Sequence, residues 1–158
     1  VSLPITEIAF KINKMIYENT LSNQFITFFF CIWNSKSKIL EYINAGHNPP
    51  LLFKEDNKIK KLYRTGKGLG INQNQKFRCK TLPLAINDIL TIYTDGIEDL
   101  FNSKYEPFGS DRLISFLMKK KDKSPSEIIK SLFLELTRYA PSPQYCDDIT
   151  IIIAKRIK

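Results

Sequence analysis

Two acidic sites in the chain follow or precede short apolar segments, where they could do metal chemistry. Asp95 comes after the apolar run 89–93, and a glycine follows it. Asp147 and Asp148 directly precede a second apolar run, 149–154. Adjacent carboxylates repel each other and persist more easily beside a cation, and their oxygens suit Mg²⁺ or Mn²⁺. A divalent-metal site is one interpretation of this pattern; the other is that both sites are ordinary turns.

The other residues with potential chemistry favour structural roles. His47 is the only histidine, and histidine is the residue type suited to general acid–base chemistry near neutral pH, but in the segment 45–50 we expect it to hydrogen-bond a proline-stiffened loop. Cys146 adjoins the second acidic site, yet a thiolate prefers softer metals than Mg²⁺ or Mn²⁺. Cys31 is expected in the core. The glycine-rich segment 66–70 is expected to be a flexible loop, and it lacks the Gly-Lys-Ser/Thr and the helix of a nucleotide-binding loop.

Hydrophobic periodicity predicts the elements that must position these residues. Helices are expected at residues 4–18, 112–118 and 125–139, with Ser124 as the N-cap of the last, and a helical turn at 97–101. Strands are expected at residues 25–33, 39–43, 51–53, 59–63, 77–82, 89–93 and 149–154. The first strand is a continuous β-favouring run that is apolar except for Thr27, which predicts burial on both faces. A helix, many strands, two helices and a strand indicate an α+β protein with largely antiparallel sheets.

Composition indicates a globular protein: the 158 residues are 43% hydrophobic and 25% charged. The longest apolar run has nine residues, too few to cross a bilayer, and no signal peptide is expected. Three widely spaced cysteines fit a reducing compartment, so we expect a cytoplasmic protein. The net charge of +8 arises mostly from residues 1–79, with 12 basic and 5 acidic side chains. A solvated lysine-rich surface is expected; nucleic-acid binding ranks last, since no reader motif accompanies the charge.

Six segments taken together resemble a known family. They include Ala45-Gly46-His47-Asn48-Pro49-Pro50, Tyr93-Thr94-Asp95-Gly96 and Asp147-Asp148-Ile149-Thr150. The complete set is residues 25–30, 42–50, 68–71, 88–96, 108–109 with 112–113, and 147–150. In this order the segments resemble the metal-dependent (PPM-type) protein serine/threonine phosphatases, and most closely the bacterial branch typified by the stage II sporulation phosphatase and the phosphatases of stress-response sigma regulators.

The resemblance implies an α-β-β-α sandwich of two mostly antiparallel sheets flanked by helices. It implies a pair of Mn²⁺ or Mg²⁺ ions, with Asp95 and Asp147 as ligands and the Gly96 backbone as a further candidate. His47 and Asp148 would be neighbours of this site. A water activated by the metals would attack phosphoserine or phosphothreonine on a regulatory protein, such as an anti-sigma-factor antagonist. No nucleic-acid partner and no direct membrane contact are expected.

One family signature does not occur in these 158 residues: a Gly-Asp segment followed by Ser or Thr and Gly-His-Gly, whose Asp bridges the two ions. We therefore expect residues 1–158 to form one N-terminally incomplete catalytic domain, with little activity alone. The whole protein would carry the missing segment, and an upstream sensor or membrane segment could precede it. The alternative function is a non-catalytic phosphatase-like module that binds a phosphorylated partner.

Overall fold

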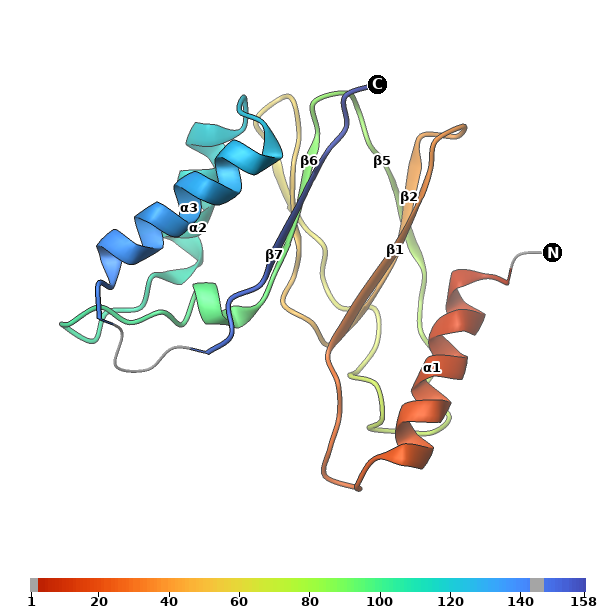
Figure 1. Cartoon of the computed structure of the whole chain (residues 1–158). Coiled ribbons are helices and arrows are strands. Elements are labelled where there is room, and N and C mark those ends of the chain that lie inside the picture. Colours follow the sequence, from red (N-terminus) through yellow and green to blue (C-terminus); the bar gives the residue numbers. More distant parts are fainter. Residues whose placement is uncertain (1–2, 143–146) are drawn as a thin grey trace. The chain divides into compact units, whose positions relative to one another are not determined.

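The computed structural model describes residues 3–142 and 147–158 of the chain. It divides into two compact units (Figure 1). Unit 1 is the chain up to Pro49 together with Leu62–Ala85, and unit 2 is Pro50–Lys61 together with the chain from Ile86 onward. The elements in chain order are α1 (Ile5–Asn19), β1 (Phe28–Asn34), β2 (Ile39–Ala45), β3 (Leu51–Phe53), β4 (Ile59–Lys61), β5 (Lys80–Pro83), β6 (Ile89–Tyr93), the 3₁₀ helix η1 (Asp95–Ile97), α2 (Gly109–Lys120), α3 (Pro125–Tyr139) and β7 (Ile151–Lys155).

Unit 1 is an antiparallel sheet with one packed helix. The strand order is β1-β2-β5, and both pairs are antiparallel. Helix α1 contributes Ile5 and Ala9 to a core that also contains Ile43, Leu69 and Phe77. These α1 residues are one turn apart, so one face of the helix packs on the core.

Strand β1 differs from the sequence prediction of a strand buried on both faces. It begins at Phe28, not at residue 25, and its side chains are half-buried or exposed. Phe25 is 58% exposed and Trp33 is 37% exposed. β1 is the edge strand of its sheet, and within the described residues β2 is the one strand paired with it. Its side chains show that continuous hydrophobicity was a poor guide to burial. Cys31, predicted in the core, is half-buried.

The glycine-rich segment 66–70, predicted as a flexible loop, is instead packed into unit 1. Leu69 is buried and exchanges two backbone hydrogen bonds with Ile26. The buried side chain of Asn13 on α1 accepts from the Gly70 N–H at 3.0 Å and donates to the Asn72 carbonyl at 2.9 Å. Gly70 has φ +87°, which a side chain would strain. The segment is thus fixed to α1 by a buried amide.

Unit 2 combines a four-stranded antiparallel sheet with helices α2 and α3. The strand order is β4-β3-β6-β7. Figure 1 shows α2 and α3 side by side on one face of this sheet. Their apolar positions, among them Leu113, Leu117 and Leu132, share one core with Phe53 and Tyr93 from the strands. The helix amphipathicity seen in the sequence therefore serves to cover the sheet that carries both acidic sites.

Helix α3 begins as the sequence predicted. Ser124 caps it: the Ser124 hydroxyl accepts from the Glu127 N–H, and the Glu127 carboxylate accepts from the Ser124 N–H. Pro125 occupies the first helical position. This reciprocal capping box satisfies two backbone donors that the helix itself leaves unpaired.

The expected fold class is confirmed: the protein is α+β, with two antiparallel sheets and three α-helices in the described residues. Predicted boundaries shift by a few residues, since β5 starts at Lys80 and β7 at Ile151, and the helical turn expected at 97–101 is η1 at Asp95–Ile97. No helix in residues 3–142 or 147–158 is long and apolar enough to span a bilayer.

Candidate metal centre

Both predicted acidic sites lie at one end of the unit 2 sheet, where β6 ends and β7 begins. We call this end of the two strands, with residues 95–99 and 147–148, the acidic edge. Strands β6 and β7 pair antiparallel with Tyr93 opposite Ile151, so the end of β6 meets the beginning of β7. Asp95 begins η1 just after β6, and Asp147 lies just before β7. The side chains of both residues are exposed. An antiparallel pair of strands thereby joins two carboxylates that are 52 residues apart in the sequence.

Thr94 ties the two acidic segments together. Its Oγ1 donates to the Asp148 carbonyl oxygen at 2.8 Å and accepts from the Thr150 N–H at 2.9 Å. Its own N–H donates to the Thr150 carbonyl at 3.0 Å. Three hydrogen bonds from one residue extend the β6–β7 ladder past the last regular pair and fix Asp148 beside Asp95.

Gly96 makes the close approach of these segments possible. A Cβ at position 96 would lie 2.7 Å from the Asp148 carbonyl oxygen and 3.0 Å from that of Asp147. Both distances are shorter than an ordinary van der Waals contact, and the neighbours are backbone atoms that cannot turn aside. The glycine is therefore needed for packing against residues 147–148, whatever ligand role its own backbone has.

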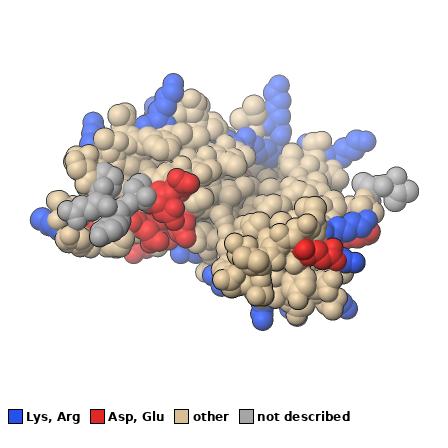
Figure 2. All heavy atoms as spheres, turned by 60° about the horizontal axis from the view of Figure 1, so that its bottom comes forward, with Lys and Arg blue, Asp and Glu red and all other residues tan. Residues whose placement is uncertain are grey.

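The edge is strongly acidic. Asp95, Asp99, Asp147 and Asp148 are all exposed there. Figure 2 shows a compact group of acidic side chains over this part of unit 2, in the view with the lower side of Figure 1 turned forward. Carboxylates gathered at one end of a sheet repel each other, and a bound cation would relieve that repulsion.

Glu98 is also part of this edge, but its carboxylate has a partner. The Tyr93 hydroxyl donates to the Glu98 carboxylate at 2.6 Å. Burial of Tyr93, together with this bond to the Glu98 carboxylate, raises the pKa of Tyr93 well above its ordinary value. The Tyr93 hydroxyl therefore stays protonated as a donor, and its bond joins the end of β6 to Glu98, the C-cap of η1.

The donor chemistry of Asp95 and Asp147 fits a hard divalent cation. Carboxylate oxygens are the ligands that Mg²⁺ and Mn²⁺ prefer, and water can complete the coordination shell. Asp147 Oδ1 also accepts from the Asp148 N–H at 2.7 Å, which orients the carboxylate. No group of three or more Asp, Glu, His or Cys side chains suited to a metal occurs in residues 3–142 and 147–158. Within these residues the two aspartates would thus supply only part of the coordination shell of a metal ion.

The other predicted site residues have mixed outcomes. Asp148 lies beside the edge, where its carbonyl oxygen accepts from the Thr94 hydroxyl. His47 belongs to unit 1, where its Nδ1 is 3.5 Å from the Thr27 hydroxyl, and its expected bond within the proline-stiffened loop stays a prediction. Cys146 lies outside the described residues. The assignment of Asp95, Asp147 and the Gly96 backbone as ligands stays a prediction.

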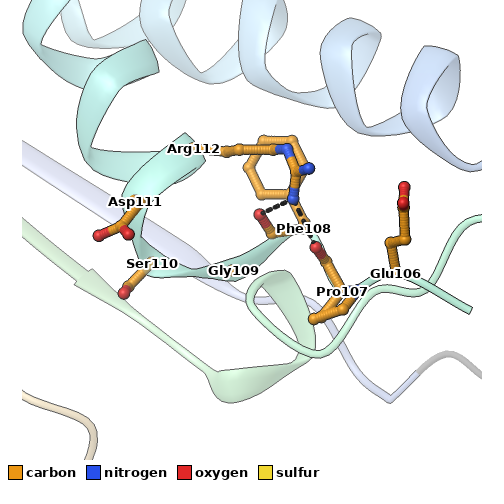
Figure 3. Close-up of a pocket in the computed structure, with 7 residues that line it drawn as sticks. All are labelled: Glu106, Pro107, Phe108, Gly109, Ser110, Asp111 and Arg112. Atoms are coloured by element: carbon orange, nitrogen blue, oxygen red, sulfur yellow. Dashed lines mark hydrogen bonds between the residues drawn. The ribbon is translucent and has the colours of Figure 1, made fainter.

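A pocket adjoins the acidic edge on the side of α2. It is lined by Glu106, Pro107, Phe108, Gly109, Ser110, Asp111 and Arg112 (Figure 3). The Arg112 guanidinium donates to the Pro107 and Phe108 carbonyls at 2.8 and 3.1 Å, and it lies 5.1 Å from the centre of the Tyr139 ring. The Gly109 N–H donates to the Glu98 carbonyl at 2.9 Å. Arg112 thus stabilises the loop before α2, which bonds to Glu98 at the end of η1.

Sequence reasoning missed the parts played by Thr94 and Gly96. Both belong to the Tyr-Thr-Asp-Gly motif, but the sequence pointed to the Asp95 carboxylate and the Gly96 backbone as candidate ligands, not to the packing roles of Thr94 and Gly96. A hydroxyl one residue before a carboxylate, followed by a glycine, was the available signal. Its meaning depended on knowing which segment lies opposite, and only the β6–β7 register gives that.

A solved structure shares this fold. The phosphatase domain of the cell-fate determinant SpoIIE from Bacillus subtilis, presoaked with manganese, matches 99% of this chain and 68% of its own with a TM-score of 0.67 at 20% identity. At this identity the likeness shows the fold alone. The two antiparallel sheets with their helices therefore have the fold of a PPM-type phosphatase domain.

The family follows from the sequence itself. The family model for stage II sporulation protein E (SpoIIE) matches residues 1–157, and the chain belongs to this family. The resemblance drawn from the six segments is thus confirmed.

Two curated relatives support the same placement. Protein IcfG of Synechocystis is 31% identical over 84% of this chain, and phosphoserine phosphatase RsbU of Bacillus subtilis is 26% identical over 92%. The match covers 21% of IcfG and 43% of RsbU. The chain thus spans less than half the length of these relatives.

Proposed function

We propose that this chain is the catalytic part of a metal-dependent protein phosphatase that acts on phosphoserine or phosphothreonine. The observation that carries the proposal is the convergence of the Asp95 and Asp147 segments at one sheet edge, held by Thr94 and Gly96. Membership of the SpoIIE family and the name of the relative RsbU, a phosphoserine phosphatase, support the reaction class.

Asp95 and Asp147 would hold the metal ions, and the charge of the edge explains why metal is needed. A phosphorylated side chain carries nearly two negative charges, which the exposed carboxylates would repel. Bound Mn²⁺ or Mg²⁺ would supply Lewis acidity toward the phosphoryl oxygens and an activated water, with two ions expected in the complete domain. Thr94 keeps the Asp147–Asp148 backbone in place, and the Tyr93–Glu98 bond joins the end of β6 to the C-cap of η1.

The substrate would be a phosphorylated regulatory protein in a signalling pathway, of the anti-sigma-factor-antagonist kind. The exposure of both aspartates favours a protein substrate, because a phosphoserine on a loop of another protein can reach an open edge. A cytoplasmic location fits the three widely spaced cysteines.

The experiment is hydrolysis of p-nitrophenyl phosphate and of a phosphoserine peptide, with and without Mn²⁺, by a chain extended upstream of Val1. Asp95→Asn and Asp147→Asn are each expected to lower kcat/KM by about 100-fold or more, because each removes charge that holds metal. Lys36→Gln, an exposed change in unit 1, is the control. Turnover that needs no metal, or that survives both substitutions, would reject the proposal.

The alternative is a non-catalytic module that binds a phosphorylated partner. It is favoured by the small number of metal-binding side chains in the described residues. The same extended chain separates the two functions. Tight binding of a phosphorylated protein without any metal-dependent turnover would establish the module, whereas turnover would remove it.

A further inference from the structure

The end of unit 2 opposite the acidic edge is strongly basic. Residues 119–123, at the end of α2 and in the turn after it, and residues 155–158, at the end of β7, carry seven basic side chains and one acidic one, Asp122. The basic residues are Lys119, Lys120, Lys121, Lys123, Lys155, Arg156 and Lys158. We call this surface, together with Ile86 and Ile157, the basic end.

Hydrogen bonds join these segments, which are far apart in the sequence. Lys155 Nζ donates to the Lys121 carbonyl at 3.0 Å, so the end of β7 meets the end of α2. Lys121 Nζ donates to the Glu55 carbonyl in the β3–β4 turn at 3.2 Å. The Asn87 N–H donates to the Arg156 carbonyl at 2.8 Å, which adds the turn before β6. Figure 1 shows the β3–β4 turn, the turn between α2 and α3, and the C-terminus at the same end of unit 2.

Part of this charge has a structural role, since Lys121 and Lys155 are hydrogen-bonded as described. In the neighbouring β3–β4 turn, Lys54 pairs with Asp88 and Lys58 pairs with Asp56. In contrast, no ion pair within residues 3–142 and 147–158 includes Lys119, Lys120 or Lys158. Lys119 and Lys120 suit the negative end of the α2 dipole, but Lys123 and Lys158 lie beyond the helix.

Two exposed isoleucines lie among these charges. Ile157 is 74% exposed between Arg156 and Lys158, and Ile86 is 48% exposed beside Asn87, which is bonded to Arg156. Exposed apolar side chains surrounded by lysines can enter the interface of a bilayer while the lysines reach its headgroups.

We propose that the basic end binds an anionic lipid surface. Each lysine or arginine near such a surface contributes about 1 kcal/mol of attraction, so several together give measurable binding. A protein partner fits less well, because lysine is depleted at protein interfaces. Single-stranded nucleic acid also fits less well, since no exposed aromatic side chain of the described residues lies in the basic end to stack on bases.

Binding to a membrane through the basic end would also orient the acidic edge. Strand β7 runs toward the basic end from the side of the acidic edge, and the eight residues from Asp148 to Lys155 span roughly 23 Å when extended. On a membrane the acidic edge would face away from the headgroups, beyond the reach of their negative potential. The sequence alone predicted no membrane contact; gathering of the charge at one end with Ile86 and Ile157 is the reason to revise that prediction.

The test is sedimentation of the 158-residue chain with lipid vesicles at low ionic strength. Vesicles of phosphatidylcholine with roughly one phosphatidylglycerol in three lipids should bind the chain, and pure phosphatidylcholine should not. High salt should release it. The triple variant Lys119→Glu, Lys120→Glu, Lys158→Glu should bind on the order of 100-fold more weakly. The matched control Lys36→Glu, Lys67→Glu, Lys76→Glu changes the net charge equally at exposed positions of unit 1.

Ile157→Ser is the second variant, because it leaves every charge in place. It should weaken vesicle binding severalfold and leave thermal unfolding unchanged. Equal binding by the two triple variants, or no binding to the anionic vesicles, would overturn the proposal. Tighter binding to a short DNA duplex or to a poly-glutamate peptide than to the vesicles would also overturn it, in favour of those partners. The assay needs no phosphatase activity, so it stands apart from the proposed function.

Discussion

The Thr94 hydroxyl and the Asp148 carbonyl oxygen are joined by a 2.8 Å hydrogen bond across the edge of the unit 2 sheet. The bond lies between the two aspartates that the sequence proposes as metal ligands, one residue away from each. Because the same hydroxyl also accepts from the Thr150 N–H, the side chain fixes the segment on both sides of Ile149. The geometry of the candidate metal centre thus depends on a residue that is not itself a ligand.

Replacing Thr94 by valine should weaken Mn²⁺ binding at least about tenfold. Valine keeps the shape of threonine but cannot bond to Asp148 or Thr150, and supporting residues typically affect metal affinity by this amount. Thr94→Ser restores the hydroxyl and should bind nearly as the parent does. Isothermal titration of the upstream-extended chain measures both, with Asp95→Asn as the control for the site itself. If Asp95→Asn lowers the affinity and Thr94→Val leaves it unchanged, Thr94 has no positioning role.

Gly96→Ala tests the close approach of the two segments. The added Cβ would lie 2.7 Å from the Asp148 carbonyl oxygen, so the segment must move, at a cost of about 1–3 kcal/mol. Gly109→Ala is a useful control: its φ of +75° strains alanine, but open space surrounds it. Both variants should lose stability in urea unfolding, but only Gly96→Ala should also lose Mn²⁺ affinity. Unchanged affinity in Gly96→Ala would mean that the centre tolerates a displaced Asp148.

Part of the fold could be predicted from the sequence because local rules governed it. Helix α3 and its capping box needed only residues within one turn, and β6 matched its predicted bounds 89–93. The errors occurred where contacts with distant parts of the chain determine the burial or pairing of a segment. The apolar run at 25–33 indicates a strand, but nothing local says that β1 has a neighbour on one side only.

The candidate site and the packing of the loops were likewise predicted only in part. The sequence singled out Asp95 and Asp147 from their positions beside apolar strands, and the strand register brings them to one edge. The rigid packing of segment 66–70 was missed, since it depends on Asn13, 57 residues away from Gly70. The basic end was missed for the same reason, because its lysines come from segments that meet only in the folded unit.

Asp147 and Asp148 should differ in their effect on metal binding. Successive residues of an extended segment point to opposite sides, so only one can face the centre. Asp147→Asn should weaken Mn²⁺ binding at least about tenfold, whereas Asp148→Asn should change it less than about threefold, given that the Asp148 backbone atoms make the contacts to its neighbours. The two variants carry the same charge change and control for each other. The reverse order of effects would shift the ligand assignment by one residue.

Asp88 should be essential for the stability of unit 2. It is 1% exposed, its carboxylate bonds to Lys54 Nζ and to the Glu55 N–H, and its carbonyl accepts from the Arg156 N–H. Asp88→Ala leaves Lys54 without this carboxylate and should cost about 3–5 kcal/mol in urea unfolding. Asp56→Ala removes the exposed pair with Lys58 and should have no measurable effect. Equal losses in both variants would show that the burial of the Asp88 pair contributes nothing.

The 158-residue chain alone should show little metal-dependent phosphatase activity, whereas an upstream-extended chain should be active. Two ions bring four positive charges, and Asp95 and Asp147 return only two negative ones. The Gly-Asp signature that would supply a bridging carboxylate does not occur in these residues. Two carboxylates can still hold one ion weakly, because water fills the remaining positions. One such ion would not orient both the attacking and the leaving oxygen, and every 1.4 kcal/mol of lost stabilisation slows the reaction about tenfold.

Comparing the activity of the 158-residue chain with that of the upstream-extended chain in a p-nitrophenyl phosphate assay with Mn²⁺ tests this prediction. Robust turnover by the short chain that Asp95→Asn abolishes would show that two carboxylates suffice.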